Sequence, residues 1–181
     1  FARQARFDLV VALITAPLQL TRTLRGLTSR FGSFGDAGFD EERFERHLEG
    51  EPSLAVATCL YWLRKLQAGV FAGNHAAAVM AAIKVERLLW MSPVIFERAE
   101  YHFYHALAVA ALCYGAPVAE RARHRKALAA HHRRLQQWAE NCPENFASRA
   151  ALIGAEIARL EDQALEAERL YEQAIQSAHA Q

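Results

Sequence analysis

Two histidines are the residues of this sequence best placed to do chemistry together. His102 and His105 lie three positions apart, so both face the same side if their segment is a helix. A zinc or di-iron site needs further ligands, and the sequence has no HExxH motif and no glutamate three positions before a histidine. We therefore expect this pair to lie at a helix surface or to hydrogen-bond between helices, and we predict no metal site.

A second histidine pair, His131 and His132, lies in a basic stretch of the chain. The phosphoacceptor histidine of a two-component kinase normally has an acidic neighbour and a proline in the following turn. Arg133 and Arg134 follow here instead. The sequence therefore argues against phosphotransfer at this position.

The three cysteines, Cys59, Cys113 and Cys142, lie far apart and have no CxxC spacing. This pattern is typical of buried thiols in a reducing compartment rather than of a disulfide framework, so we expect a cytoplasmic protein. Cys113 lies among apolar residues, whereas a nucleophilic cysteine needs a cationic and partly exposed setting. We expect it to be a core thiol.

The glycine-rich stretch around Gly32, Gly35 and Gly38 lacks the GK[ST] ending of a phosphate-binding loop. No GxSxG motif for a nucleophilic serine occurs anywhere in the chain. We therefore predict no catalytic residue, no cofactor and no enzyme activity for this chain, and we expect the glycine-rich stretch to be a connecting loop.

Charge is balanced overall but unevenly distributed, with 21 Lys+Arg against 20 Asp+Glu. Six basic residues and one acid lie between Glu120 and Arg134, whereas eight acids and three arginines lie from Glu140 onward. No aromatic residues interleave with the basic stretch, so solvated helix faces are favoured and we expect no nucleic-acid binding. The longest apolar stretch, Ala106 to Val118, is too short to span a bilayer, and we expect no membrane partner.

Apolar residues recur at steps of three and four along most of the chain, and no segment alternates with a period of two. This periodicity predicts an all-α protein of about seven or eight helices, arranged as antiparallel pairs joined by short turns. A first stripe, expected to face the core, comprises Leu9, Leu13, Ala16, Leu20, Leu24 and Leu27. Pro17 should kink or split that helix. A loop is expected over residues 30–40.

Turn and cap residues divide the middle of the chain. A short helix is expected over 41–48, and Pro52 suits the first turn of the next helix. That helix should bury Ala55, Cys59, Trp62, Leu66 and Val70 and end at Gly73 and Asn74. A further stripe consists of Ala78, Ala82, Val85 and Leu89. Ser92 and Pro93 then predict the start of a helix whose inward face carries Phe96, Ala99, Phe103, Ala106 and Ala110.

Three more helices are predicted in the last third of the chain. Breaks at 115–117, 141–143 and 162–163 separate them, and the most polar helix, over 118–140, has Leu128, Leu135 and Trp138 as apolar anchors. Asn145 is a candidate N-cap for a helix over 147–160. The last helix covers 164–178.

The last two helices resemble a tetratricopeptide repeat (TPR), in which small residues let two helices approach closely and an aromatic fills the groove to the next pair. The residues that carry this resemblance are Ala151, Ala155, Ala158, Ala167, Tyr171 and Ala174. We predict an irregular TPR-like solenoid that forms one domain over 1–181, although a generic helical bundle would show similar stripes. The start at Phe1 and the stop at Gln181 inside a helical pattern lead us to expect a fragment of a longer protein.

Six aromatic residues at helical spacing are candidates either for core packing or for contact with a partner in a repeat groove. They are Trp62, Trp90, Tyr101, Tyr104, Trp138 and Tyr171.

Several stretches together resemble one protein family over nearly the whole chain. They are RTLRGLTSRFGSFGDAGFDEERFERHL (22–48), YWLRKLQ (61–67), LWMSP (89–93) with AEYHFY (99–104), LQQWAENCPENF (135–146), EIAR (156–159) and AERLYEQAI (167–175). These motifs resemble the helical middle region of very large bacterial signalling proteins. In those proteins a serine/threonine-kinase-like domain and an AAA-type ATPase module precede this region, and a GAF domain and a sensor histidine kinase follow it.

The resemblance implies a non-catalytic, TPR-like interaction or linker domain that couples the ATPase module to the sensory and kinase modules. Its partners would be other domains of the same chain or a protein or peptide, with a homodimer as a further possibility. The alternative is a scaffold segment of an ATPase-containing transcription regulator, or a free-standing protein-binding helical repeat. The family's catalytic residues would all lie outside this sequence.

Overall fold

The computed structural model describes residues 7–91 and 95–180, and these ranges are predominantly helical. Within them, the one β-type pairing is an isolated bridge between Asp36 and Phe39. The predicted all-α class is confirmed. The described helices are α1 (Asp8–Leu24), α2 (Glu41–Gly50), α3 (Ala55–Phe71), α4 (His75–Leu88), α5 (Ile95–Gly115), α6 (Val118–Asn141), α7 (Pro143–Leu160) and α8 (Ala164–His179), with short 3₁₀ helices η1 (Pro52–Leu54) and η2 (Leu89–Met91).

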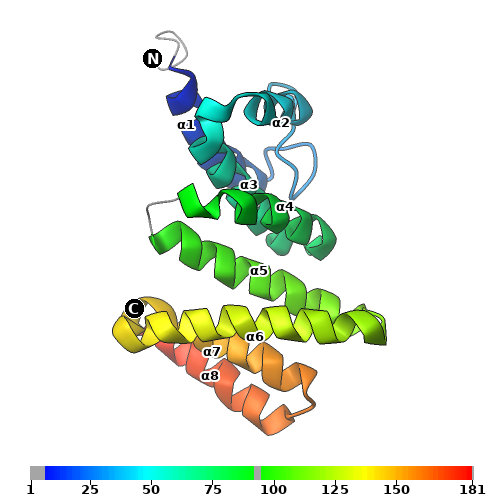
Figure 1. Ribbon diagram of the computed structural model, residues 1–181, viewed down its shortest axis with the longest axis vertical. Coiled ribbons are helices and arrows are strands. Elements are labelled where there is room, and N and C mark those ends of the chain that lie inside the picture. The colour runs from blue at the N-terminus through cyan, green and yellow to red at the C-terminus, as the bar shows by residue number, and fades with distance from the viewer. Residues whose placement is uncertain (1–6, 92–94, 181) are drawn as a thin grey trace. The chain divides into compact units, whose positions relative to one another are not determined.

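The chain divides into two compact units, Phe1–Tyr101 and His102–Gln181. Helices α1 to α4 belong to the first unit and α6 to α8 to the second, while α5 begins in the first and ends in the second (Figure 1). A single domain over residues 1–181 stays a prediction.

Helix α3 is the centre of the first unit. Ten of its 17 residues are buried, and Tyr61, Leu63 and Leu66 have no exposed surface. A helix that is apolar on more than one face has to be covered on several sides. Helices α1, α2 and α4 all contact it, which makes α3 the element against which the other helices of this unit are positioned.

Helices α3 and α4 form an antiparallel pair that packs tightly at Gly69. A Cβ atom added at Gly69 would lie 3.0 Å from both the Cβ and the backbone nitrogen of Ala78. The stripe predicted for α4 is confirmed at Ala78, Ala82 and Val85, which are fully buried. Leu89, its last predicted member, lies in η2 and is only half-buried.

The face that α1 turns toward the core differs from the predicted leucine stripe. The helix is continuous across Pro17, and it buries small and polar side chains instead: Ala12, Thr15, Ala16, Gln19 and Thr23. Of the predicted stripe, only Ala16 is buried, and Leu9, Leu24 and Leu27 are each more than 40% exposed. Four of these five side chains are small, and α1 packs against α3, so the core-facing side of α1 is not its leucine stripe.

The loop expected over 30–40 is confirmed, and it is packed against the first unit. Phe34 is fully buried, with its ring edge-on to Tyr61 at a centroid distance of 5.6 Å. Gly32 has φ +84°, and a Cβ atom there would lie 2.5 Å from the Cβ of Ala72. Only glycine fits this left-handed position against the end of α3. The loop is thus an ordered, packed part of the first unit.

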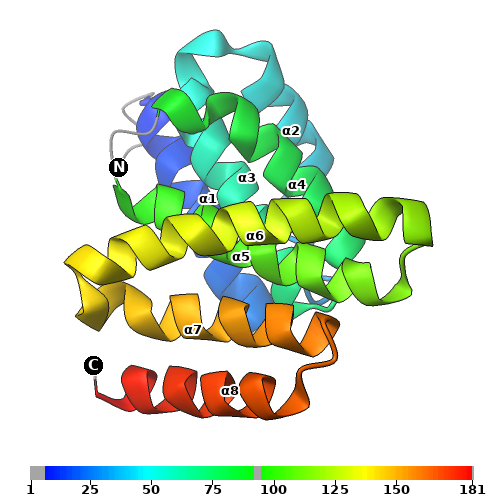
Figure 2. The ribbon, with the colours of Figure 1, turned by 60° about the horizontal axis from the view of Figure 1, so that its bottom comes forward.

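In the second unit, α7 packs between α6 and α8 (Figure 2). The pair α7 and α8 is antiparallel and joined by a tight turn in which Asp162 has φ +58°. The predicted small residues lie in this interface: Ala151, Ala155, Ala158, Ala167 and Ala174 are all buried. The TPR-like helix pair expected at the end of the chain is therefore present.

Two further local predictions are wrong, and one lies outside the described residues. Asn145 does not cap a helix: α7 begins at Pro143, and the Asn145 amide donates to the Cys142 sulfur from within the first turn. The reason is that proline itself starts the helix at its first position. Phe96, expected in the core, is 52% exposed. The start signal at Ser92 and Pro93 lies outside the described ranges.

None of the helices in the described ranges is both long enough and apolar enough to cross a membrane.

Candidate functional site

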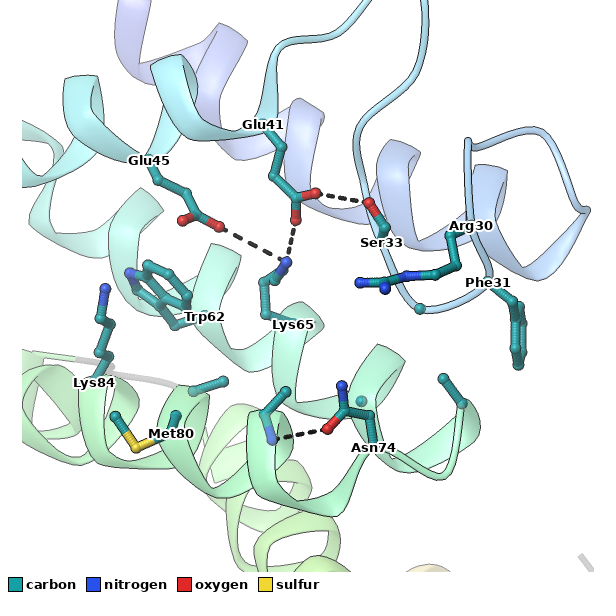
Figure 3. Close-up of a pocket in the computed structure, with 15 residues that line it drawn as sticks. Arg30, Phe31, Ser33, Glu41, Glu45, Trp62, Lys65, Asn74, Met80 and Lys84 are labelled. Carbon is teal, nitrogen blue, oxygen red and sulfur yellow. Dashed lines mark hydrogen bonds and ion pairs between the residues drawn. The ribbon is translucent and has the colours of Figure 1, made fainter.

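The first unit contains a cavity of about 480 Å³ between the loop, α2, α3 and α4 (Figure 3). Trp62 and Lys65 line its floor from α3, and Met80 and Lys84 line it from α4. Arg30 enters from the loop, where its side chain extends into the cavity. The cavity is therefore lined by both apolar and charged side chains.

Trp62 and Lys84 form a shared wall between this cavity and a second hollow of about 420 Å³. The Lys84 ammonium lies 3.8 Å from the centroid of the Trp62 ring and 2.6 Å from the Glu49 carboxylate. Trp62 is only 7% exposed, so its ring is held in place by packing. The two hollows together form what we call the Trp62 groove, defined by Trp62, Lys84, Met80 and Leu88.

The Glu41 carboxylate organises the loop side of this groove. One of its oxygens accepts hydrogen bonds from the Ser33 hydroxyl at 2.9 Å and from the Phe34 and Gly35 backbone N–H groups at 3.0 Å. Its other oxygen accepts from Lys65, whose ammonium also lies 3.7 Å from Glu45. A single carboxylate thus connects the loop, α2 and α3.

The pKa of Glu41 reflects two opposing effects. Burial alone would raise the pKa, but the hydrogen bond and positive charge of Lys65, together with the donors Ser33 and Phe34, lower it below its usual value. Glu41 is therefore a charged structural group at neutral pH and not a proton donor.

Buried thiol and phenol groups of this unit are not activated either. Burial and the nearby Glu97 carboxylate raise the pKa of the Cys59 thiol to about 11. Burial, with the charges of Glu45 and Glu41, also raises the pKa of Tyr61. At neutral pH both groups are protonated, so neither is a ready nucleophile.

In the second unit, three histidines from two helices lie together. The Nδ1 atoms of His102 and His131 are 2.8 Å apart, and the rings of His105 and His131 have a centroid distance of 4.6 Å. Trp138 lies against His102 at 5.5 Å. The expected hydrogen bonding between helices is confirmed for His102. Within the described residues, no group of three or more His, Cys, Asp or Glu side chains has a metal-binding arrangement.

These histidines predict a pH-dependent stability. Burial, and then the neighbouring His131, lower the pKa of His105 to about 3, and burial, with His102, lowers that of His131 to about 4. Because both imidazoles are neutral in the fold and titrate near pH 6.5 when unfolded, their stabilising contribution is complete above pH 6.5 and is lost as the pH falls. Each contributes a slope of up to about 1.4 kcal/mol per pH unit.

The measurement is urea unfolding at about pH 7 and about pH 5, compared with the double variant His105→Gln, His131→Gln. We expect the wild-type chain to lose at least about 1 kcal/mol over this interval and the double variant to lose clearly less. Imidazole pKa values near 6.5 in an NMR titration would contradict this prediction.

The second unit also has grooves on both sides of the α7 and α8 pair. One, of about 420 Å³, is mostly apolar and is lined by Phe103, Leu152, Tyr171 and Ile175, with Arg149 over the Phe103 ring at 5.3 Å. The other, of about 540 Å³, is lined mainly by polar and small side chains of α6, α7 and α8. An apolar groove of this kind offers surface for a helix or an extended segment, not for a reaction.

The six aromatic candidates have different places in the structure. Trp62 and Tyr171 line grooves, whereas Tyr101 is 3% exposed and packs in the core. Trp138 lies against His102 and Phe146, and Tyr104 packs edge-on to Phe103. Trp90 is 75% exposed in η2. A role in partner binding stays a prediction for all six.

Sequence reasoning missed the charged members of the Trp62 groove. Lys65, Lys84 and Glu41 lie in ordinary helical positions, and nothing in their spacing distinguishes them from solvated surface charges. The one available signal was the unusual density of aromatic residues around the loop, because Phe34 and Phe44 both pack on Tyr61 and bring the loop to α3.

Comparison with known proteins identifies a family. The family model described as CHK1-like, TPR repeats matches residues 41–181. No curated protein and no solved structure matches the chain.

Proposed function

Because the chain belongs to the family of CHK1-like TPR repeats, we propose that it acts through binding, as a non-catalytic linker between the modules of a larger signalling protein. Repeats of this family type are stacked helix pairs, and they generally mediate protein–protein interactions. The helical-repeat interaction region is the part of this statement that the family match supports.

The finer proposal is that the parent protein is a multidomain sensor histidine kinase. In it, this region couples an ATPase module to the sensory and kinase modules. Its support is the sequence resemblance over 22–48, 61–67, 89–93, 99–104, 135–146, 156–159 and 167–175, which includes residues before the family match. The alternative is a scaffold segment of an ATPase-containing transcription regulator. A histidine-kinase core in the coding sequence downstream favours the first, and a helix-turn-helix domain favours the second.

The observation that carries the binding role is the Trp62 groove. Its walls combine a fixed indole ring, an ammonium group and the exposed Met80 side chain, which is 62% exposed. Aromatic and methionine side chains supply contact area, while the charged rim gives orientation. The adjoining charges of this unit are already paired, Lys65 with Glu41 and Lys84 with Glu49.

Exposed groove residues provide the test. In the full-length parent, the double variant Met80→Glu, Lys84→Ala should weaken the coupling of kinase output to the nucleotide state of the ATPase module by about tenfold or more. The reason is that it places a carboxylate in the contact surface and removes one cation. Autophosphorylation is measured with ATP analogues bound to the ATPase module and without them.

The matched control is Leu165→Glu on α8 of the second unit, at a side chain that is 84% exposed and does not line the Trp62 groove. Regulation unchanged in the groove variant, or lost equally in the control, would contradict the proposed role. Unchanged autophosphorylation and regulation after deletion of residues 41–181 would contradict the linker function as a whole.

A further inference from the structure

Each of the two hollows of the Trp62 groove contains an arginine of its own. Arg30 lines the first hollow and its side chain extends into it, whereas Arg87 lines the second hollow (Figure 3 shows the first). Trp62 and Lys84 line both hollows and so lie between the two arginines. Both arginines are exposed, and neither guanidinium group forms a hydrogen bond or an ion pair with any residue that the structure describes.

The carboxylates that line the groove are, by contrast, all engaged by hydrogen-bond donors of the first unit. The pairs are Lys65 with Glu41, Tyr61 with Glu45 at 2.9 Å, Lys84 with Glu49 at 2.6 Å, and Ser53 with Glu51 at 2.8 Å. Acidic and basic residues are equal in number along the groove, but the charges left without a partner are the two guanidinium groups. The groove is therefore electrostatically complementary to an anionic ligand.

The spacing of the two arginines determines the length of this ligand. Arg30 and Asn74 line the same hollow, and Arg87 lies 13 positions after Asn74, which is about 20 Å along α4. An extended segment covers about 20 Å in about six residues. A helix of that length and about 10 Å across would fill about 1,500 Å³, whereas the hollows have volumes of about 480 and 420 Å³. The groove therefore fits an extended segment.

The surface between the arginines is suited to an apolar side chain. The Trp62 ring is held in place by packing, and Met80 on α4 is 62% exposed. Leu88 continues the same face of α4 into the second hollow, because it lies eight positions after Met80. A large apolar side chain of the ligand would remove this surface from water.

We propose that the Trp62 groove binds an extended acidic segment of a partner protein. Two acidic positions about six residues apart pair with Arg30 and Arg87, and a large apolar side chain between them packs on Trp62 and Met80. A guanidinium group binds a carboxylate through two parallel N–H···O hydrogen bonds, which gives the segment its register. This inference rests on the proposed function and adds the chemistry of the partner.

The probe is a synthetic peptide of eight residues, with two aspartates at each end, a serine next to each aspartate pair, and leucine and phenylalanine in the centre. An N-terminal fluorescein and a C-terminal amide ensure that no terminal carboxylate contributes. The control peptide has asparagine in place of every aspartate. Fluorescence anisotropy with the 181-residue chain should show at least about tenfold tighter binding of the acidic peptide, and added salt should reduce the difference.

Variants of the chain assign the binding to the two arginines. Arg30→Gln and Arg87→Gln should each weaken binding of the acidic peptide by about threefold or more, and the double variant by about tenfold or more. Arg25→Gln is the matched control, because Arg25 is an exposed arginine of the same unit that lines neither hollow. It should leave binding unchanged, and circular dichroism verifies that each variant is folded.

Equal affinity for the acidic and the control peptide would overturn the proposal, as would equal losses in Arg25→Gln and in the double variant. A peptide with phosphoserine at both ends that binds more than about tenfold tighter than the aspartate peptide would also overturn it, because the occupant would then be a phosphorylated segment. These outcomes leave the linker role standing, since that role is tested separately by regulation of the parent protein in the variant Met80→Glu, Lys84→Ala.

Discussion

Replacing Gly69 by leucine is expected to lower the free energy of unfolding of the first unit by about 3 kcal/mol or more. The first atom of the new side chain would already lie 3.0 Å from the Cβ and N atoms of Ala78 and 3.1 Å from its Cα. Those atoms belong largely to the backbone of α4, so no side-chain rotation relieves the contact. The two helices have to separate, and the α3 and α4 pair loses its packing.

Gly50→Leu is the control for this substitution. Gly50 is the last residue of α2, and a Cβ there would meet no atom within 4 Å. Urea unfolding should therefore show a change within about 1 kcal/mol for Gly50→Leu. Equal effects at both glycines would mean that the close approach of α3 and α4 does not stabilise this unit.

Replacing Glu41 by glutamine is expected to lower the free energy of unfolding of the first unit by about 3 kcal/mol, which is the second large effect. The glutamine amide keeps one acceptor oxygen but loses the negative charge that balances Lys65. Its NH₂ group is a hydrogen-bond donor and would replace one of the two carboxylate oxygens, so that it faces groups that are themselves donors. The three loop donors Ser33, Phe34 and Gly35 then compete with Lys65 for the one remaining acceptor oxygen. We expect the loop to detach from α3, which amide hydrogen exchange at Phe34 and Gly35 would show as faster exchange.

Glu42→Gln is the matched control, because Glu42 is the next residue of the same helix turn and forms only an exposed ion pair with Arg46 at 3.7 Å. Loss of this ion pair should lower the free energy of unfolding by less than about 0.5 kcal/mol. Since the pKa of Glu41 is lowered in the fold, its contribution is complete above the usual carboxyl pKa and is lost as the pH falls below it. The difference in the free energy of unfolding between the wild-type chain and Glu41→Gln should accordingly become smaller below about pH 4. A difference that is constant with pH would contradict the ion-pair account.

The helices were largely predictable because turn chemistry marked their ends. Gly73 with Asn74, Pro117, and Cys142 with Pro143 each lie at an observed helix boundary. The side of α1 that faces the core was not predictable, because its leucines fit one helical stripe and its small residues fit another. Which stripe is buried depends on how closely α3 approaches, and this is a property of the packed structure.

The candidate site was predictable only in part, for a related reason. Trp62 could be singled out by its type, whereas Lys84 and Lys65 gain their roles from neighbours distant in sequence. Glu41 and Lys65 are 24 positions apart, and no local pattern links them. Similarly, His102 and His131 meet because α5 and α6 bring them together.

The central claim is that this chain works by holding a segment of another module in the Trp62 groove. Its most direct test is an NMR titration of the ¹⁵N-labelled chain with the separately purified ATPase and GAF modules that we propose for the parent protein. The three tryptophans give three indole N–H signals from different places: Trp62 in the groove, Trp90 exposed in η2 and Trp138 in the second unit. We expect one of the modules to shift the Trp62 signal and the backbone signals of Met80 and Lys84 in a saturable manner, while Trp138 stays unchanged. If neither module moves the Trp62 signal at saturating concentration, the claim is wrong.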